Sequence, residues 1–236
     1  MKTKFRLIIS LLLAALLLTS CATIRAPTPQ DILRAELLKW KNFSAEGVME
    51  VNYSFISLRK MFSVNKTGDE FRLDMLDGGI MGINTEPLMS LYMGPYLSLK
   101  IPIYPDLEQI AASLDIQSNP LAFLKDTDGI VSRYGNEIIA NHKVSIGDAD
   151  LSFNERLQLT RIDIRDVDSS LEVAYSKKGD PDIVTFNLEN KATLKMLVDS
   201  ISYRQAEVSP LPKSQPAPLS DDLLKLMDKL LSPRGK

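Results

Sequence analysis

Few residues in this sequence have the types and spacing that chemistry requires. Glu46 and Glu50 fall on one face of a predicted strand, where two carboxyl groups could serve as acid and base. The same alternation makes them the polar outer face of that strand. His142, the only histidine, stands alone in a turn-like segment. No G-x-S-x-G elbow, phosphate-binding loop or H-E-x-x-H motif is present. We therefore predict that the chain is not an enzyme, and a hydrolase is the least favoured alternative.

Metal ligands are equally sparse. One Cys and one His in 236 residues argue against a protein-only zinc site. Asp163, Asp166 and Asp168 have a spacing that could suit calcium, but Arg161 and Arg165 alternate with them. Interleaved charges of both signs favour a solvated, salt-paired strand face. We expect neither a metal nor a cofactor.

The N-terminus has the pattern of a bacterial secretion signal. Basic residues at positions 2, 4 and 6 precede the apolar run Leu7–Leu18, which is shorter than the roughly 20 residues of a transmembrane helix. The tetrad Leu18-Thr19-Ser20-Cys21 resembles a bacterial lipobox, in which an aliphatic residue and two small residues precede Cys. The resemblance implies removal of residues 1–20 and acylation of Cys21. An ordinary signal peptide with a chance Cys, or a retained membrane anchor, are the alternatives.

An acylated Cys21 would attach the protein to membrane lipid, since each buried CH₂ contributes about 0.8 kcal/mol. Residues 21–29 would form the tether. In bacteria with a Lol-type sorting system, Asp after the acylated Cys tends to retain a lipoprotein in the inner membrane, whereas this chain has Ala22. By that resemblance we expect the periplasmic face of a Gram-negative outer membrane. A formal net charge of −2 and a pI near 5.6 argue against nucleic-acid binding.

The body of the chain has the periodicity of a curved antiparallel sheet with a few helices. Apolar spacing predicts a helix over Pro29–Asn42. Over Phe43–Phe55 the period changes to two, and thirteen residues of alternation suit a barrel or a strongly curved sheet. Helical pieces are predicted at Asp106–Leu114 and Pro120–Lys125. The other predicted strands, joined by short turns and so antiparallel, lie near Leu58–Val64, Phe71–Met75, Met89–Met93, Leu97–Ile103, Asn136–Ala140, Lys143–Phe153, Arg156–Asp166, Ser170–Ser176, Asp182–Glu189 and Ala192–Arg204.

The passage from the first helix into the first strand is Trp-Lys-Asn-Phe-Ser-Ala-Glu-Gly, residues 40–47. A strand meander, a central helical insertion and further strands follow, all behind a lipobox. This layout resembles the LolA/LolB-type superfamily of lipoprotein carriers and receptors, over roughly Ile32 to Tyr203. The resemblance implies an α+β fold that is mainly β, a half-open, unclosed barrel over a few helices, occupying residues 30–204. It also implies that the apolar concave face holds acyl chains.

Two sets of apolar residues are candidate lipid contacts in such a fold. In the receptor of the Lol pathway, a loop after the third strand carries an exposed apolar residue that helps deliver lipoprotein to the membrane. The resemblance implies the same contact for Ile80, Met81 and Ile83, in the glycine-rich segment Asp77–Asn84. The alternative is that these side chains pack under the sheet. The candidate cavity residues are Met49, Val51, Tyr53, Phe71, Leu73 and Met75.

The C-terminal region adds a second possibility for function. A Pro-rich linker, residues 205–218, precedes a predicted amphipathic helix at 219–232 with the apolar stripe Leu223–Leu231. The first hypothesis is a lipoprotein that binds lipoprotein or phospholipid acyl chains and assists lipoprotein localisation to the outer membrane. The alternative is a non-catalytic scaffolding lipoprotein whose Leu223–Leu231 helix docks an envelope protein.

Overall fold

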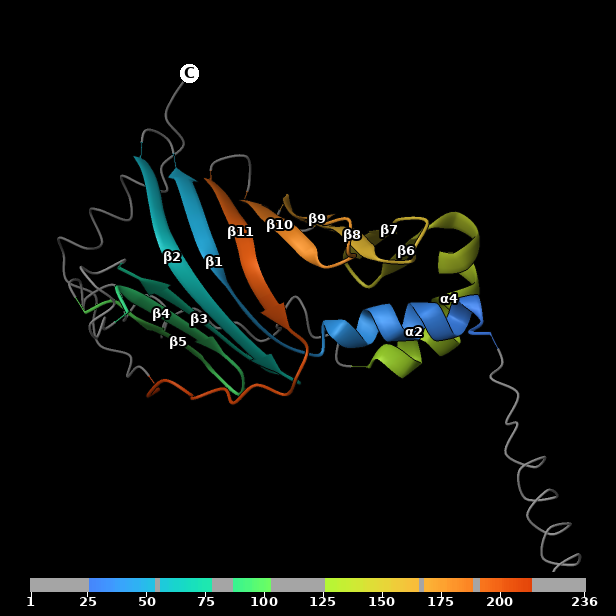
Figure 1. Ribbon diagram of the computed structural model, residues 1–236, viewed down its shortest axis with the longest axis horizontal. Helices are drawn as coiled ribbons and strands as arrows, with labels where there is room; N and C mark the ends of the chain where they lie inside the picture. The colour runs from blue at the N-terminus through green and yellow to red at the C-terminus, as the bar shows by residue number, and fades with distance from the viewer. Residues whose placement is uncertain are drawn as a thin grey trace, which may run out of the picture.

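The computed structural model describes residues 26–53, 56–77, 87–102, 126–165, 168–188 and 192–213 (Figure 1). They form one antiparallel sheet in the order β5-β4-β3-β2-β1-β11-β10-β9-β8-β7-β6. The strands are β1 (Asn42–Tyr53), β2 (Ile56–Thr67), β3 (Glu70–Leu76), β4 (Met89–Met93), β5 (Leu97–Lys100), β6 (Lys143–Ile146), β7 (Ala149–Phe153), β8 (Leu159–Ile164), β9 (Ser169–Tyr175), β10 (Pro181–Leu188) and β11 (Ala192–Ser202). Because β5 and β6 do not pair with each other, the sheet is not closed. The predicted class, a mainly β unclosed antiparallel sheet with helices, is confirmed.

The sheet consists of two strand meanders joined along one seam. The chain runs outward from β1 to β5, re-enters at the opposite edge with β6, and returns to β11, which pairs with β1. The pairing extends from Ser44↔Ser202 to Tyr53↔Ala192, with a register shift between Glu46 and Gly47. A Cβ on Gly47 would lie 2.0 Å from the carbonyl oxygen of Leu197, so only glycine fits at this bulge. Such bulges increase the local twist of a sheet.

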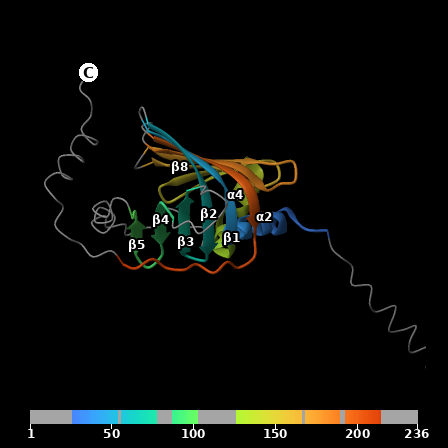
Figure 2. The same cartoon turned by 60° about the vertical axis from the view of Figure 1, so that its left-hand side comes forward.

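Helices α2 (Pro29–Lys39) and α4 (Thr127–Asn141) cover only one half of the sheet. Their buried residues pack with the inward side chains of β6 to β8 in one apolar cluster. Its central members are Leu33, Leu37, Ile130, Ile138, Leu151, Leu159 and Ile162. The other half has its own cluster on β1 to β3, formed by Ala45, Met49, Phe62, Val64, Leu73 and Met75. The two halves therefore have separate cores on one continuous sheet. Figure 2 shows both helices beside one part of that sheet.

The start of α2 is fixed by a capping box. The Thr28 hydroxyl accepts from the backbone N–H of Asp31, and the Asp31 carboxylate accepts from that of Thr28. The helix ends at Lys39, before the predicted Asn42, because Asn42 already belongs to β1. The side-chain oxygen of Asn42 accepts from the N–H of Gly68, in the β2–β3 turn, at 3.0 Å. The end of α2 is thus held beside the ends of β2 and β3.

Two predicted strands are wrong. Asn136–Ala140 lies inside α4, which Asp126 caps by accepting from the N–H of Gly129 at 2.9 Å. Apolar residues at helical spacing along α4 reach the core and outweigh the β-branched pair at 138–139. The predicted strand Lys143–Phe153 is a hairpin, β6 and β7, because Gly147 turns the chain at φ +60°.

The part of the predicted linker that the structure describes is docked on the sheet. We call Gln205–Lys213 the strap. Its backbone carbonyls accept hydrogen bonds from side chains of successive strands: Thr67 to Ala206, Arg72 to Ser209, Tyr96 to Leu211 and Ser98 to Pro212. Leu211 is only 6% exposed. Figure 2 shows the orange-red strap leaving β11 and running along β1 to β5.

Beneath the strap, the outer face of β3 to β5 is a buried polar layer. The neighbours of Ser90, Tyr92 and Ser98 in sequence face inward, so these three residues face outward. All three are nevertheless buried. The Tyr92 hydroxyl donates to Glu70 at 2.8 Å, and Ser90 donates to Asp74. The outer face of these three strands is therefore covered by the strap.

We predict that Leu211→Ala lowers the free energy of unfolding by about 2–4 kcal/mol, because it empties a buried site under the strap. Urea unfolding followed by circular dichroism measures the change. Lys213→Ala, at an exposed position of the same strap, should change the free energy by no more than about 0.5 kcal/mol. Equal effects of the two variants would show that the strap is not docked in solution.

Candidate functional site

A cavity of about 330 Å³ lies between the two apolar clusters, on the concave side of the sheet. That volume is at the lower end of the range of small-molecule sites, about 300–1,000 Å³. Its walls come from both meanders and from the end of α2. The apolar lining residues are Trp40, Phe43, Ala45, Phe62, Val64, Phe71, Leu73, Leu91, Met93, Ile162, Ile164, Leu171, Pro181, Val184, Phe186, Leu194, Met196, Val198 and Ile201. Strand alternation places these side chains on one face of the sheet.

The polar lining residues are Glu36, Lys39, Lys66, Tyr175 and Tyr203. All five belong to one end of the cavity, because they lie in the last turn of α2, at the ends of β2 and β9, and directly after β11. In an antiparallel sheet these strand ends meet at the same edge. The cavity therefore has a polar end beside α2 and an apolar interior.

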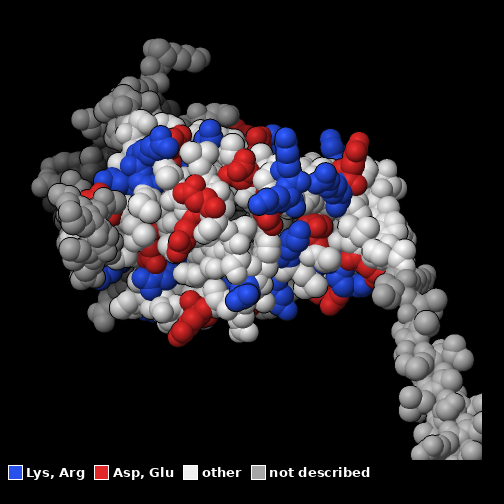
Figure 3. All heavy atoms as spheres, in the orientation of Figure 1, with Lys and Arg blue, Asp and Glu red and all other residues white. Residues whose placement is uncertain are grey.

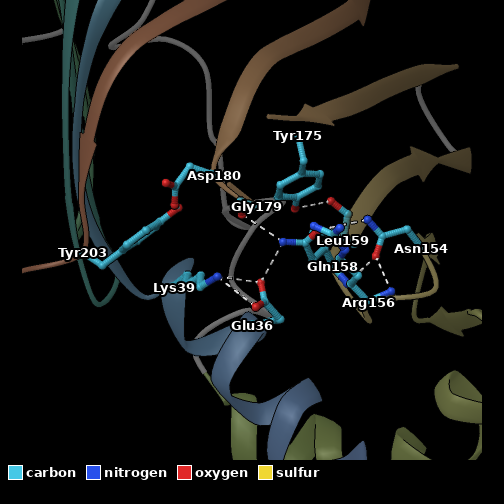
Figure 4. A network of polar contacts seen from close by, with 10 residues as sticks. All are labelled: Glu36, Lys39, Asn154, Arg156, Gln158, Leu159, Tyr175, Gly179, Asp180 and Tyr203. Atoms are coloured by element: carbon cyan, nitrogen blue, oxygen red, sulfur yellow. Dashed lines mark hydrogen bonds and ion pairs between the residues drawn. The ribbon is translucent and has the colours of Figure 1, made fainter. Parts of the chain in front are cut away.

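A hydrogen-bond network holds α2 at this polar end (Figure 4). Glu36 accepts from the Lys39 ammonium at 2.8 and 2.9 Å. The amide of Gln158, which is 3% exposed, donates to Glu36 at 3.3 Å and to the carbonyl of Gly179 at 2.9 Å. Gln158 thus ties the helix to two turns of the second meander, and a buried amide so placed fixes the position of the cavity mouth.

The two tyrosines complete the network. The Tyr175 hydroxyl donates to the carbonyl of Leu159 at 2.6 Å, and the Tyr203 hydroxyl donates to Asp180 at 3.1 Å. The Lys39 ammonium lies 5.7 Å from the centre of the Tyr203 ring, a cation–π distance. Burial, reinforced by nearby carboxylates, raises the pKa of both phenols, so both are neutral at physiological pH.

Lys66 is the most buried charged residue of the cavity, at 4% exposure. Its stem follows Phe62 and Val64 on the inward face of β2, and its ammonium donates to the carbonyl of Gly68 in the adjoining turn. A long side chain that covers apolar surface and directs its charge to the edge is a common arrangement. Burial lowers the pKa of Lys66, and Asp69 opposes that effect.

The six candidate cavity residues from the sequence lie in three different places. Phe71 and Leu73 line the cavity. Met49 and Met75 are buried in the neighbouring cluster, and Val51 packs against it. Tyr53 lies at the far end of β1, paired with Ile56 and Ala192. The contacts of these residues with a lipid stay a prediction.

Sequence reasoning missed the polar end of the cavity. One signal was available for Lys66, which has the same strand parity as Phe62 and Val64 and so belongs to the inward face. Tyr175 gives the same signal, because it shares the strand parity of Leu171 and Val173 in β9, and Tyr203 shares that of Ile201.

Several predicted contacts lie outside the described residues: Cys21, Ile80, Met81, Ile83 and the Leu223–Leu231 helix. Of the acidic residues considered for chemistry, Glu50 pairs with Arg59 at 3.5 Å and Asp163 with Arg161 at 2.7 Å.

Two further features are absent from the described residues. Across these ranges no three His, Cys, Asp or Glu side chains gather as a metal site would require. No helix within the same ranges has the length and apolarity that crossing a membrane requires. The charge distribution of one face is drawn in Figure 3, where acidic and basic side chains are interspersed.

No protein-family model and no curated protein matches the sequence. Solved structures similar to this chain include a LolA superfamily protein of Nitrosomonas europaea, with 10% identity, a TM-score of 0.40, and coverage of 77% of this chain and 96% of that one. An outer membrane lipoprotein-sorting protein domain of Vibrio parahaemolyticus has 7% identity, a TM-score of 0.37, and coverage of 73% and 91%. The Pseudomonas aeruginosa MucA/MucB complex has 12% identity, a TM-score of 0.33, and coverage of 74% and 56%.

We predict that the tyrosines of the native protein ionise at a higher pH than those of the unfolded chain. Burial raises the pKa of Tyr92 to about 12 and that of Tyr175 and Tyr203 further, whereas an ordinary tyrosine has a pKa of 10.0. Since the folded-state pKa is the higher one, the stabilisation is complete below pH 10.0 and is lost as pH rises above it. Phenolate absorbance should therefore rise at a higher pH in the native chain than in the urea-unfolded chain. Coincident titration curves would contradict this prediction.

Proposed function

We propose that this chain is a membrane-anchored periplasmic lipoprotein that binds an acyl chain in its concave cavity and assists lipoprotein localisation to the outer membrane. The observation that supports this most directly is the cavity, whose walls are apolar except at the end beside α2. Burying a hydrocarbon chain there removes apolar surface from water on both the ligand and the protein, which contributes about 25 cal/mol per Å².

The pattern of side chains suits binding rather than catalysis. The polar groups at the cavity end are engaged with one another or with backbone carbonyls: Glu36 with Lys39, Tyr203 with Asp180, and Tyr175 with Leu159. Among the described lining residues there is no serine, cysteine or histidine that could act as a nucleophile beside a base. A concave, mostly apolar site with a few polar groups is the usual form of a small-molecule site.

The proposed anchoring depends on Cys21, the only cysteine of the chain. Acylation there would hold the cavity near the membrane from which it takes, or to which it gives, its cargo. Phospholipid and lipoprotein acyl chains are the two cargo classes that we propose.

We expect an acyl-chain adduct when a photoreactive phenylalanine analogue at Phe71 is irradiated in cells that express the full chain. Phe71 lines the cavity, so the analogue would lie against the bound chain. Mass spectrometry of the purified adduct distinguishes a phospholipid from a lipoprotein. The same analogue at Tyr134, which packs on the helix cluster, is the matched control. Equal labelling at both positions, or none at Phe71, would contradict the proposal.

We further predict that Cys21→Ser abolishes incorporation of a palmitate analogue. The reason is that no other thiol is present to accept the lipid. Ser20→Ala keeps a small residue before the cysteine and should leave labelling unchanged. A labelled Cys21→Ser variant would refute the anchoring proposal.

A further inference from the structure

We propose that the cavity takes one hydrocarbon chain of an amphiphile with an anionic headgroup, carboxylate or phosphate, and that the headgroup binds beside Lys66 at the α2 end. This inference rests on the proposed function, because it specifies the class of ligand that the same cavity takes.

The direction of binding follows from the two ends of the cavity. The end beside α2 carries all five polar lining residues. Farther from α2 along β1 and β3, Met49 and Met75 are buried, at 1% and 9% exposure, and do not line the cavity. A hydrocarbon chain therefore enters with its end pointing toward these methionines, and its headgroup stays beside α2.

Lys66 gives the headgroup site its sign. Its backbone pairs with Phe43 on one side and Phe71 on the other, and both of these aromatic residues line the cavity. The Lys66 residue is 4% exposed, so its ammonium is poorly solvated even at the edge that it reaches, and a nearby anion would compensate for that. An ammonium group has three donors, and the carbonyl of Gly68 takes one. Asp69 and Lys41 also act on this ammonium, with opposite signs.

The other polar groups do not compete for this role. Lys39 is paired with Glu36, so these two charges largely neutralise each other at the mouth. The hydroxyl protons of Tyr175 and Tyr203 are already donated to Leu159 and Asp180. The Lys39 side chain is 31% exposed, so this end of the cavity reaches water. A headgroup there would keep part of its hydration while it contacts Lys66.

A cationic headgroup does not fit the same place. It would face Lys66 and Lys39, and the only carboxylate among the described lining residues, Glu36, is already engaged by Lys39 and Gln158. An uncharged headgroup would not compensate for the poor solvation of the Lys66 ammonium. The charge of the lining therefore favours an anion over both alternatives.

Trp40 supplies the readout, because it is the only tryptophan of the chain and lines the cavity at its polar end. The full chain in vesicles of neutral phosphatidylcholine would be titrated with dodecanoate, dodecyl phosphate and dodecanol, each brominated on the chain so that binding quenches Trp40. The variants are Lys66→Met, Lys66→Arg and, as a matched control, Lys143→Met at an exposed position of β6.

The expected result has three parts. In the parent chain the two anions bind about tenfold or more tightly than dodecanol, the scale of a charge-assisted hydrogen bond. Lys66→Met removes that preference while dodecanol affinity stays within about twofold. Lys66→Arg and Lys143→Met retain the preference. Whether carboxylate or phosphate binds more tightly identifies a fatty acid or a phosphorylated lipid as the better match.

The outcomes separate the two proposals. If dodecanol and the anions bind equally, and Lys66→Met changes nothing, the headgroup inference is overturned and acyl-chain binding stands. If no compound quenches Trp40 in the folded parent chain, both proposals fail. Retained dodecanol binding by Lys66→Met shows that the cavity of this variant is intact, so a lost preference is not a folding defect.

Discussion

The pairing of β1 with β11 is the interaction on which the rest of the structure depends. It joins residues that are about 150 positions apart in sequence, and without it the chain would be two separate meanders, each with its own apolar cluster. The cavity has walls from both meanders, so it exists only once this seam has formed. Long-range pairing of this kind carries a large loop-closure cost and slows folding. The close approach at Gly47 is therefore a constraint on function as well as on the fold.

The cavity persists because the helices cover the sheet unevenly. Both α2 and α4 pack against β6 to β8, and only the last turn of α2 reaches the space over β1 to β4. A curved sheet with one covered half has inward side chains that face each other across a gap too wide for them to fill. The hydrogen bonds of Gln158 hold α2 where it ends, so the gap does not close by movement of the helix. The same residues that limit the helix thus give the gap its polar end.

Much of the fold could be predicted from the sequence, because a half-buried strand has an apolar residue at every second position. That is why β1, β3 and β4 were placed well, and why Phe71 and Leu73 could be named in advance. The prediction failed at Asn136–Ala140, where adjacent β-branched residues imitate a strand and only the Asp126 cap and more distant apolar residues indicate a helix. The docking of the strap could not be foreseen, since it uses backbone carbonyls, which every residue has. The strand parity of Lys66 and Tyr175 indicates that each faces inward, but their meeting at one end of the cavity depends on the pairing of strands far apart in sequence.

The strap also changes what the outer face of the sheet exposes to other molecules. The side chains of Arg72 and Ser98 donate to carbonyls of the strap from β3 and β5, so the strap crosses these strands on the side away from the cavity. A second sheet can stack only on a face that is bare. One short peptide thereby withdraws the outer face of β3 to β5 from contact with other molecules and leaves the concave face as the accessible apolar surface of these strands.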